Sequence, residues 1–483
     1  MDTNLTKSAA IGIMWSGITQ FSLQTFRFIV IIILARLLNP EDFGIVGLAA
    51  LFIGIINIIN DLGLSAAIIQ RKDLEKAHLS TSFWASVGIA ILLWFFSILI
   101  SPFVADFFQE GLVRPVLIVT SAGLVIGSFC VVHKALLQKK LKFKKIAIAE
   151  ISGAFVSGIA SIILAFNQFG VWSLVYGQLL ANFVMVLIFW RLCSWKPGFN
   201  FSYRHFKDLF TFGGNVMGSR LLNYIDSNVD YLVVGKLLGK TSLGYYTIAY
   251  QLMTFPLHKI SMMVTRVTFP VFSTIQDDND ALRRGYTKTV RYISLITFPL
   301  LTGMLAVAPE FIIVVFGEKW APIILPLQIL CLAGALKSIG TTVGSVLLAK
   351  GRSDLQFKWN IITVIVVPIA VVIGANYGII GVASAITVMT ILLFPIIQTI
   401  TNRLIDLSMY EYMKAIYPSI IGSLVLLTGV EIFQKSVAIY NISDIIMLGS
   451  SILIGFIVYL LTLWLFFNNL FKELNLLIYK IKM

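Results

Sequence analysis

Long apolar runs separated by short polar connections make up most of the chain between residues 10 and 467. A run of about 20 apolar residues is what an α-helix needs to cross the hydrocarbon core of a bilayer. Fourteen such runs predict an all-α membrane protein with fourteen spans. Their expected limits are 10–35, 43–69, 80–105, 113–137, 146–166, 170–192, 213–238, 242–272, 287–309, 322–349, 359–376, 379–401, 415–433 and 444–467.

The seventh run differs from the others because it carries five polar residues, namely Arg220, Asn223, Asp226, Ser227 and Asp230. At about 100° per residue they fall within an arc of ~120° on a helix. A charge at the bilayer centre costs on the order of 2.5–3.5 kcal/mol, so this arc needs water or partner charges beside it. We interpret the helix as one wall of a central polar cavity. The alternative is a buried seam of ion pairs that binds no ligand.

Three other runs add polar side chains at membrane depth. The candidates for substrate binding outside the seventh run are Gln20, Gln24 and Arg27 in the first, Lys259 and Arg266 in the eighth, and Lys337 in the tenth. Lys259 can extend its amine to the interface, whereas Arg27 and Arg266 have apolar turns on both sides. Since the first and seventh runs open equivalent halves of the chain, we expect their polar arcs to face each other.

Asp226 and Asp230 are spaced i, i+4 and therefore share one helix face. They are candidates for holding a coupling cation or proton. The alternative is that they pair with Lys259 or Arg266.

Weak internal similarity supports two halves. Leu37, Leu38, Gly44 and Ala49 recur 200 positions later as Leu237, Leu238, Gly244 and Ala249. An even number of spans per repeat gives both halves the same orientation, with the axis that relates them along the membrane normal. The expected domains are an N-terminal six-helix bundle (1–192), a cytoplasmic linker with an interfacial helix (193–212), a second six-helix bundle (213–401), and two further helices with a cytoplasmic tail (402–483).

Composition excludes an ordinary soluble domain. Apolar residues make up 58% of the 483 residues and charged residues only 12%, against about 25% charged in soluble domains. The net charge of +14 reflects basic connections such as the run from Lys139 to Lys145, which predict an inner side facing anionic lipid and both termini in the cytoplasm. Nucleic acid is not an expected partner.

No enzyme signature is present. The chain lacks a glycine-rich phosphate loop followed by Lys and Ser or Thr. Its cysteines are Cys130, Cys193 and Cys331, and its histidines are His78, His133, His205 and His258. Both sets are scattered, so we expect neither a disulfide framework nor a metal or other cofactor.

Two stretches resemble a known family. LARLLNPEDFGIVGLA (Leu34–Ala49) and NDLGLSAAIIQRKDL (Asn60–Leu74) are similar to the polysaccharide-exporter branch of the multidrug/oligosaccharidyl-lipid/polysaccharide superfamily, which includes Wzx-type flippases. The resemblance implies two six-helix bundles around a cationic cavity, plus helices 13 and 14. It also implies that undecaprenyl-diphosphate-linked oligosaccharide is flipped by alternating access, with Arg27 and Arg266 at the head group.

These features together predict a flippase for lipid-linked oligosaccharide repeat units in the inner membrane of a bacterium, acting in cell-surface polysaccharide biosynthesis. We expect a monomer whose partners are the substrate, membrane lipids, and the glycosyltransferases and polymerase of the same pathway. One alternative is a cation-coupled multidrug antiporter of the same superfamily. A membrane polysaccharide polymerase is a further alternative, which the short external loops disfavour.

Overall fold

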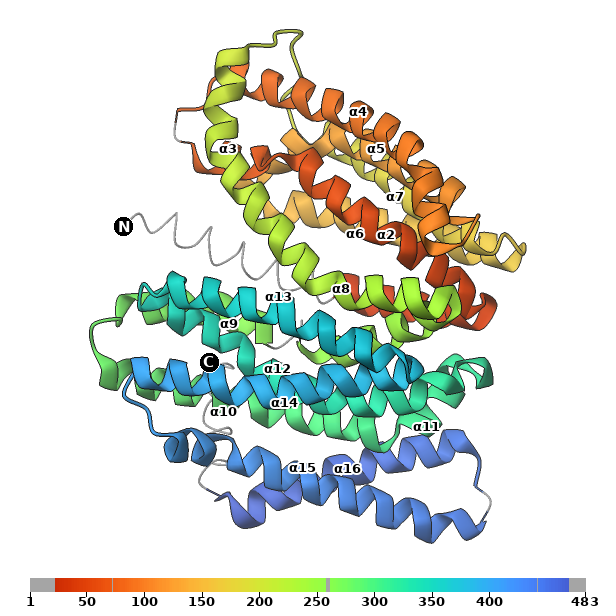
Figure 1. Ribbon diagram of the computed structural model, residues 1–483, viewed down its shortest axis with the longest axis vertical. Coiled ribbons are helices and arrows are strands. Elements are labelled where there is room, and N and C mark those ends of the chain that lie inside the picture. Colours follow the sequence, from red (N-terminus) through yellow and green to blue (C-terminus); the bar gives the residue numbers. More distant parts are fainter. Residues whose placement is uncertain (1–21, 72, 258–260, 441, 469–483) are drawn as a thin grey trace. The chain divides into compact units, whose positions relative to one another are not determined.

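The computed structural model describes residues 22–71, 73–257, 261–440 and 442–468. Within these ranges every regular element is a helix, as predicted (Figure 1). Eleven of the described segments are long and apolar enough to cross a membrane. The helix at 22–37 and the long helix α8 are not among these eleven, so the count of fourteen spans stays a prediction.

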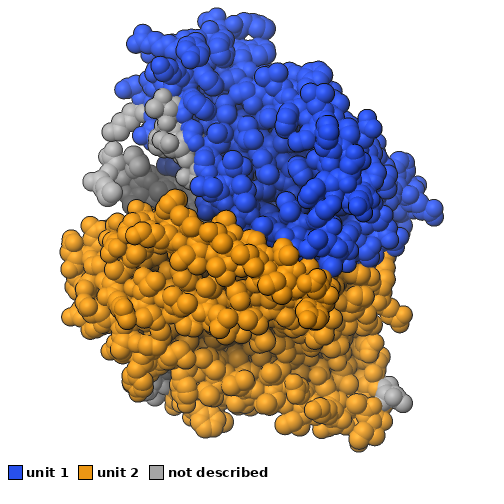
Figure 2. Space-filling model, viewed as in Figure 1, with its two compact units in different colours: residues 1–244 blue, residues 245–483 orange. Residues whose placement is uncertain are grey.

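The chain divides into two compact units, residues 1–244 and residues 245–483 (Figure 2). The division falls within the long helix α8. The domain limits predicted at residues 192, 212 and 401 stay predictions.

Unit 1 begins, in its described part, with a helix at 22–37. Its labelled helices are α2 (Pro40–Asp61), α3 (Leu64–Gln70), α4 (Lys76–Phe108), α5 (Val113–Lys139), α6 (Phe143–Phe166), α7 (Val171–Leu192) and most of α8 (Tyr203–Pro256). Helix α4 packs on α5, α6 packs on α7, and α5 also contacts α2 and α7. Large apolar side chains on the outer face of α4, such as Leu92 and Phe103, are exposed, as expected for a face that contacts lipid.

Helix α2 has strong local signals at both ends. Pro40 occupies the first turn and the Asp42 carboxylate accepts from the amide of Asn39 at 2.9 Å, which is the arrangement favoured at a helix start. The helix ends where Leu62 and Gly63 take positive φ angles of 45° and 68°. The expected span 43–69 is therefore two helices, α2 and α3, because the apolar pattern continues through a turn that backbone conformation imposes.

Helix α8 runs through the end of the expected linker at 212 and includes the seventh apolar run. Its helical path is interrupted at Gly239, where φ is 80° and ψ is −180°. This conformation is essentially restricted to glycine. The interruption separates the seventh and eighth expected spans.

Unit 2 contains the end of α8 and all later elements. These are α9 (Met262–Thr274), α10 (Asn279–Ala306), α11 (Ala308–Phe311), the π-helix η2 (Ile312–Phe316), the 3₁₀ helix η3 (Glu318–Ile323), α12 (Ile324–Ala349), α13 (Ser353–Ala375), α14 (Gly378–Leu404), α15 (Met409–Val437), η4 (Ala438–Tyr440) and α16 (Asp444–Phe466). Helix α10 packs on α12 and α15, α14 packs on α12 and α13, and α16 packs on α15. Buried polar groups between α10 and α14 are paired, since Gln398 bonds both Tyr286 and Asn402.

Candidate functional site along helices α2 and α8

Two glycines bring the backbones of α2 and α8 into direct contact. A Cβ atom on Gly44 would lie 1.8 Å from the carbonyl oxygen of Lys240, and one on Gly244 would lie 1.9 Å from the carbonyl oxygen of Pro40. Neither separation leaves room for a side chain. The contact therefore requires glycine at both positions.

Charged side chains surround this contact. The Lys240 amine donates to Glu110 at 3.1 Å and lies 3.5 Å from Glu41. The hydrogen bond to Glu110 and the charges of both carboxylates raise the pKa of Lys240. Lys240 therefore stays protonated and links α8 to the start of α2 and the end of α4.

At its other end, α2 forms an ion pair with α8. The Arg220 guanidinium donates to Asp61 Oδ2 at 2.6 Å, and the Ser65 hydroxyl donates to Asp61 Oδ1 at 2.5 Å. The Arg220 side chain is half exposed, at 50%, while that of Asp61 is 21% exposed. Asp61 and Ser65 belong to the second stretch that carried the family resemblance, so that stretch supplies the partner of the only arginine in the seventh run.

Between these two contacts, Tyr224 fastens α8 to the middle of α2. Its hydroxyl lies 3.0 Å from the carbonyl oxygen of Ala50 and 3.2 Å from that of Leu51. The ring lies directly against Gly54, where a Cβ atom would be 2.2 Å from the ring carbon next to the hydroxyl. Together with the ion pair, this contact fixes the rotation of α8 about its own axis within unit 1.

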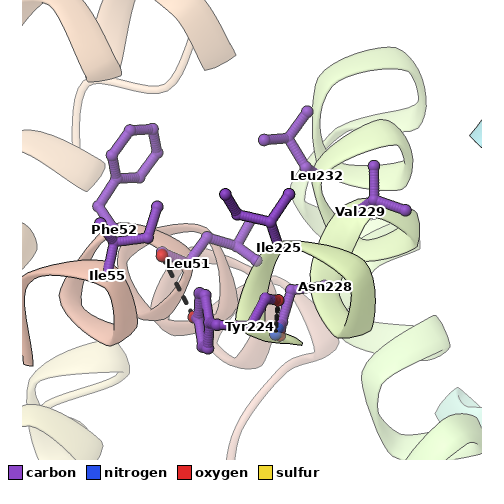
Figure 3. Close-up of a pocket in the computed structure, with 8 residues that line it drawn as sticks. All are labelled: Leu51, Phe52, Ile55, Tyr224, Ile225, Asn228, Val229 and Leu232. Atoms are coloured by element: carbon purple, nitrogen blue, oxygen red, sulfur yellow. Dashed lines mark hydrogen bonds between the residues drawn. The ribbon is translucent and has the colours of Figure 1, made fainter. Parts of the chain in front are cut away.

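An apolar pocket opens beside Tyr224 (Figure 3). It is lined by Leu51, Phe52 and Ile55 of α2 and by Tyr224, Ile225, Asn228, Val229 and Leu232 of α8. The Asn228 amide donates to the carbonyl oxygen of Tyr224 at 2.7 Å, so it is satisfied within its own helix. The pocket suits a hydrocarbon group rather than a charged one.

The predicted polar arc of α8 divides into exposed and buried parts. Arg220, Asn223, Asp226 and Ser227 are exposed. Asp230 is only 6% exposed, and its carboxylate accepts from the amide of Tyr231 at 3.0 Å. The two aspartates are therefore in different environments despite their shared face.

On the helix at 22–37, Arg27 points away from the packed side. Phe26 stacks on Phe155 of α6 with ring centroids 4.5 Å apart, while Val30 and Leu34 are buried. Arg27 is exposed and has no hydrogen-bond or ion-pair partner within the ranges that the structure describes. Gln24 is half-buried.

Among the three candidate residues of unit 2, only Lys337 has a described side chain. Lys337 on α12 is half-buried, and its amine donates to the hydroxyl of Tyr250 at 3.2 Å. The amine also lies 5.2 Å from the centre of the same ring. Arg266 lies on α9, but its side chain is outside the described part, as are residues Lys259 and Gln20.

Sequence reasoning did not single out three residues whose side chains make contacts between helices. They are Tyr224, Tyr250, and Lys134 of α5, whose amine lies 2.8 Å from Glu150 of α6. A lysine within an apolar run is a recognisable signal, because it needs a partner at that depth. The tyrosines give no such signal, since aromatic residues are common on any membrane helix.

A family model and several known proteins match most of the chain. Residues 33–325 match the family model described as "Polysaccharide biosynthesis protein". The lipopolysaccharide biosynthesis protein WzxC of Escherichia coli is 31% identical over 402 residues, which cover 83% of this chain and 81% of that protein. The teichuronic acid biosynthesis protein TuaB of Bacillus subtilis is 29% identical over 416 residues, 86% of each chain.

The fold is also that of a solved transporter. A structure of the lipid II flippase MurJ in an inward closed conformation aligns with a TM-score of 0.75 at 19% identity. The alignment covers 95% of this chain and 100% of that one. At this identity the likeness concerns the arrangement of helices.

Proposed function

Because this chain belongs to the polysaccharide biosynthesis protein family, we propose that it is a flippase that moves lipid-linked oligosaccharides across the cytoplasmic membrane. Its membership confirms the resemblance predicted from Leu34–Ala49 and Asn60–Leu74. The substrates are undecaprenyl-diphosphate-linked repeat units for cell-surface polysaccharides. The names of WzxC and TuaB, and the fold shared with a lipid II flippase, support this assignment.

The observation that carries the proposal is the exposed polar face of α8. Asn223, Asp226 and Ser227 are exposed on a helix of a multi-pass membrane protein. Hydrocarbon cannot solvate such groups, so the face lines an aqueous path. Sugars and a diphosphate need such a path, while the polyprenyl chain stays in the lipid.

The proposed architecture has fourteen spans with both termini in the cytoplasm. Two six-helix bundles, 1–192 and 213–401, carry out alternating access, with 193–212 as a cytoplasmic linker and 402–483 as an additional helix pair and tail. The protein acts as a monomer in the inner membrane of a bacterium. The glycosyltransferases and polymerase of the same pathway make its substrate and use its product.

Basic side chains bind the diphosphate in this proposal. Arg27 and Arg266 have planar guanidinium groups, which can hold phosphate oxygens in bidentate fashion. Lys259 and Lys337 add positive charge. Arg220 contributes mainly by positioning α8, because it is paired with Asp61. Polar groups without charge, namely Gln20, Gln24 and Asn223, contact the sugars.

Asp226 is the better placed of the two candidate coupling residues, because it is exposed while Asp230 is buried. A cation or proton can reach an exposed carboxylate without local opening of the helix packing. The carboxylate of Asp230 then contributes to the electrostatic field around Asp226.

Vesicles that contain the purified protein and a fluorescent undecaprenyl-diphosphate oligosaccharide test the function. A membrane-impermeant reductant bleaches only the outer leaflet unless the lipid is flipped. We expect the reductant to bleach more of the fluorescent lipid than the outer-leaflet fraction. In protein-free vesicles it should bleach that fraction only. Bleaching equal to that of protein-free vesicles, together with uptake of organic cations driven by an ion gradient, would instead identify a multidrug antiporter.

A further inference from the structure

Two histidines and a glutamate from distant parts of the sequence meet at the first turns of α4 and α8, within unit 1. Glu75 precedes the first residue of α4, His78 is the third residue of α4, and His205 is the third residue of α8. One ligand atom from each of the three lies within 4.8 Å of the others. The two imidazole rings are perpendicular, with centroids 4.3 Å apart.

His205 is oriented as a metal ligand would be. Its Nδ1 lies 2.7 Å from the Ser202 hydroxyl, and its Nε2 lies 3.4 Å from Glu75 Oε2. A histidine that binds a metal usually gives its other ring N–H to an acceptor, which fixes the ring. With Nδ1–H donated to Ser202, the lone pair of Nε2 points toward Glu75.

His78 contributes a nitrogen that needs a partner. The side chain is 1% exposed, and its Nε2 has no hydrogen-bond partner among the residues that the structure describes. Its Nδ1 accepts only a long 3.3 Å bond from the Glu75 amide. A buried polar atom without a partner destabilises the fold. A metal ion bound at Nε2 would supply that partner, while the ring proton moves to Nδ1 and the long bond from the Glu75 amide is given up.

The dimensions suit a small transition-metal ion. Zinc binds histidine nitrogen and carboxylate oxygen at about 2.0–2.2 Å, so tetrahedral ligand atoms stand roughly 3.3 Å apart. The His205–Glu75 separation of 3.4 Å already matches. One ring nitrogen of His78 lies within 4.8 Å of the other two ligand atoms, so it has to approach by at most about 1.5 Å. Glu75 is 69% exposed, which gives an ion access from water.

The surrounding charges also permit a cation. The starts of α4 and α8 are positive ends of helix dipoles, but the Glu75 carboxylate is in the site and Asp208 lies one turn further along α8. The charge of Arg71 is offset by Asp208, which lies 3.7 Å from its guanidinium.

We propose that Glu75, His78 and His205 form a binding site for a divalent transition-metal ion such as Zn²⁺, with water as the fourth ligand. The ion fastens the first turn of α8 to the first turn of α4, across 127 positions of sequence between the histidines. It adds to the apolar contact that Leu209 and Phe206 make with Ala85 and its neighbours. The site is independent of the transported substrate.

Zinc titration of the full-length protein, freed of any histidine tag and pre-treated with chelator, tests the site. We expect one Zn²⁺ per chain, and Co²⁺ in its place should give the visible absorption of a tetrahedral complex. Glu75→Gln, His78→Gln and His205→Ala should each weaken binding by about 10-fold or more. Asp106→Asn, an exposed acid near the other end of α4, should change it less than about threefold.

Trypsin cleavage after Arg204 and Lys207 provides a second readout. Zinc should slow this cleavage in the wild type and in Asp106→Asn, but not in His205→Ala, and size-exclusion profiles check that each variant is folded. Absence of stoichiometric zinc binding to the wild type would overturn the site. So would wild-type affinity in all three trio variants.

Discussion

Arg220 of α8 donates to Asp61 of α2 at 2.6 Å, an ion pair between residues 159 positions apart. We expect this pair to stabilise unit 1 modestly, because the arginine side chain is 50% exposed. A double-mutant cycle of Arg220→Ala and Asp61→Ala in thermal unfolding should give a coupling free energy of about 0.5–1 kcal/mol. The Arg352–Asp354 pair, which is exposed and local in sequence, is the matched control and should give a smaller value. Equal coupling in both cycles would contradict a positioning role for Arg220.

The glycine contact between α2 and α8 should tolerate no side chain. Gly44→Ala and Gly244→Ala place a methyl group within 2 Å of a carbonyl oxygen, so each should lower the free energy of unfolding by about 1–3 kcal/mol. Gly88→Ala in α4 is the control, because a Cβ atom there meets nothing within 4 Å. Melting temperatures of the detergent-solubilised proteins measure the effect, and unchanged values for both contact variants would rule out the tight packing.

Labelling of single cysteines tests the orientation in the membrane. In a chain without Cys130, Cys193 and Cys331, cysteines at the exposed positions Asn167 and Asn376 should react with an impermeant thiol reagent in intact cells. Cysteines at Lys140 and Ser353, also exposed, should react only after the cells are opened. Labelling of the second pair in intact cells would show that the orientation in the membrane is opposite to the one proposed.

Arg27 and Arg266 are expected to be required for transport. Replacing either by Ala should stop export of the lipid-linked sugar while protein levels stay near normal, and Lys should restore activity only in part because it loses the planar fork. Arg36→Ala, at the end of the same helix as Arg27 and also exposed, serves as the control and should export normally. Wild-type export by both Arg27→Ala and Arg266→Ala at matched expression would exclude a head-group site there.

Substitution should distinguish the role of Asp226 from that of Asp230. Because Asp226 is exposed and Asp230 is buried, Asp226→Asn should remove dependence on an ion gradient while the protein still folds. Flipping with and without an imposed gradient measures this dependence, and Ser227→Ala, also exposed on this face, is the control. A protein that fails to reach the membrane after Asp226→Asn would point to pairing with a basic side chain instead.

The helices were predictable from sequence to the extent that hydropathy determines them. The runs at 113–137, 146–166 and 170–192 correspond closely to α5, α6 and α7. The break between α2 and α3 was not predictable from hydropathy, because Leu62 and Gly63 continue an apolar run while turning the backbone. A short helix was expected within 193–212, and α8 begins there at Tyr203, but hydropathy did not predict that this helix continues without a break into the seventh apolar run.

Side-chain pairing over long separations was the least predictable part. The polar arc of α8 follows from helix periodicity, but nothing in the sequence places Asp61 beside Arg220. His78 and His205 appear scattered along the chain, yet their rings lie 4.3 Å apart. Spacing rules for metal sites depend on ligands that are close in sequence, so a site assembled from the ends of two helices gives no such signal.

The backbone contact between α2 and α8 has a property that links it to the internal similarity of the chain. Gly44 meets the carbonyl of Lys240 and Gly244 meets the carbonyl of Pro40, and both the glycines and the carbonyl residues are 200 positions apart. This reciprocity is that of an isologous interface in a two-fold dimer, where residue i of one copy contacts residue j of the other, and residue j of the first copy contacts residue i of the second. A duplicated gene that once encoded a self-associating half-length protein would leave this trace, with both sides of the ancestral contact now carried by a single chain.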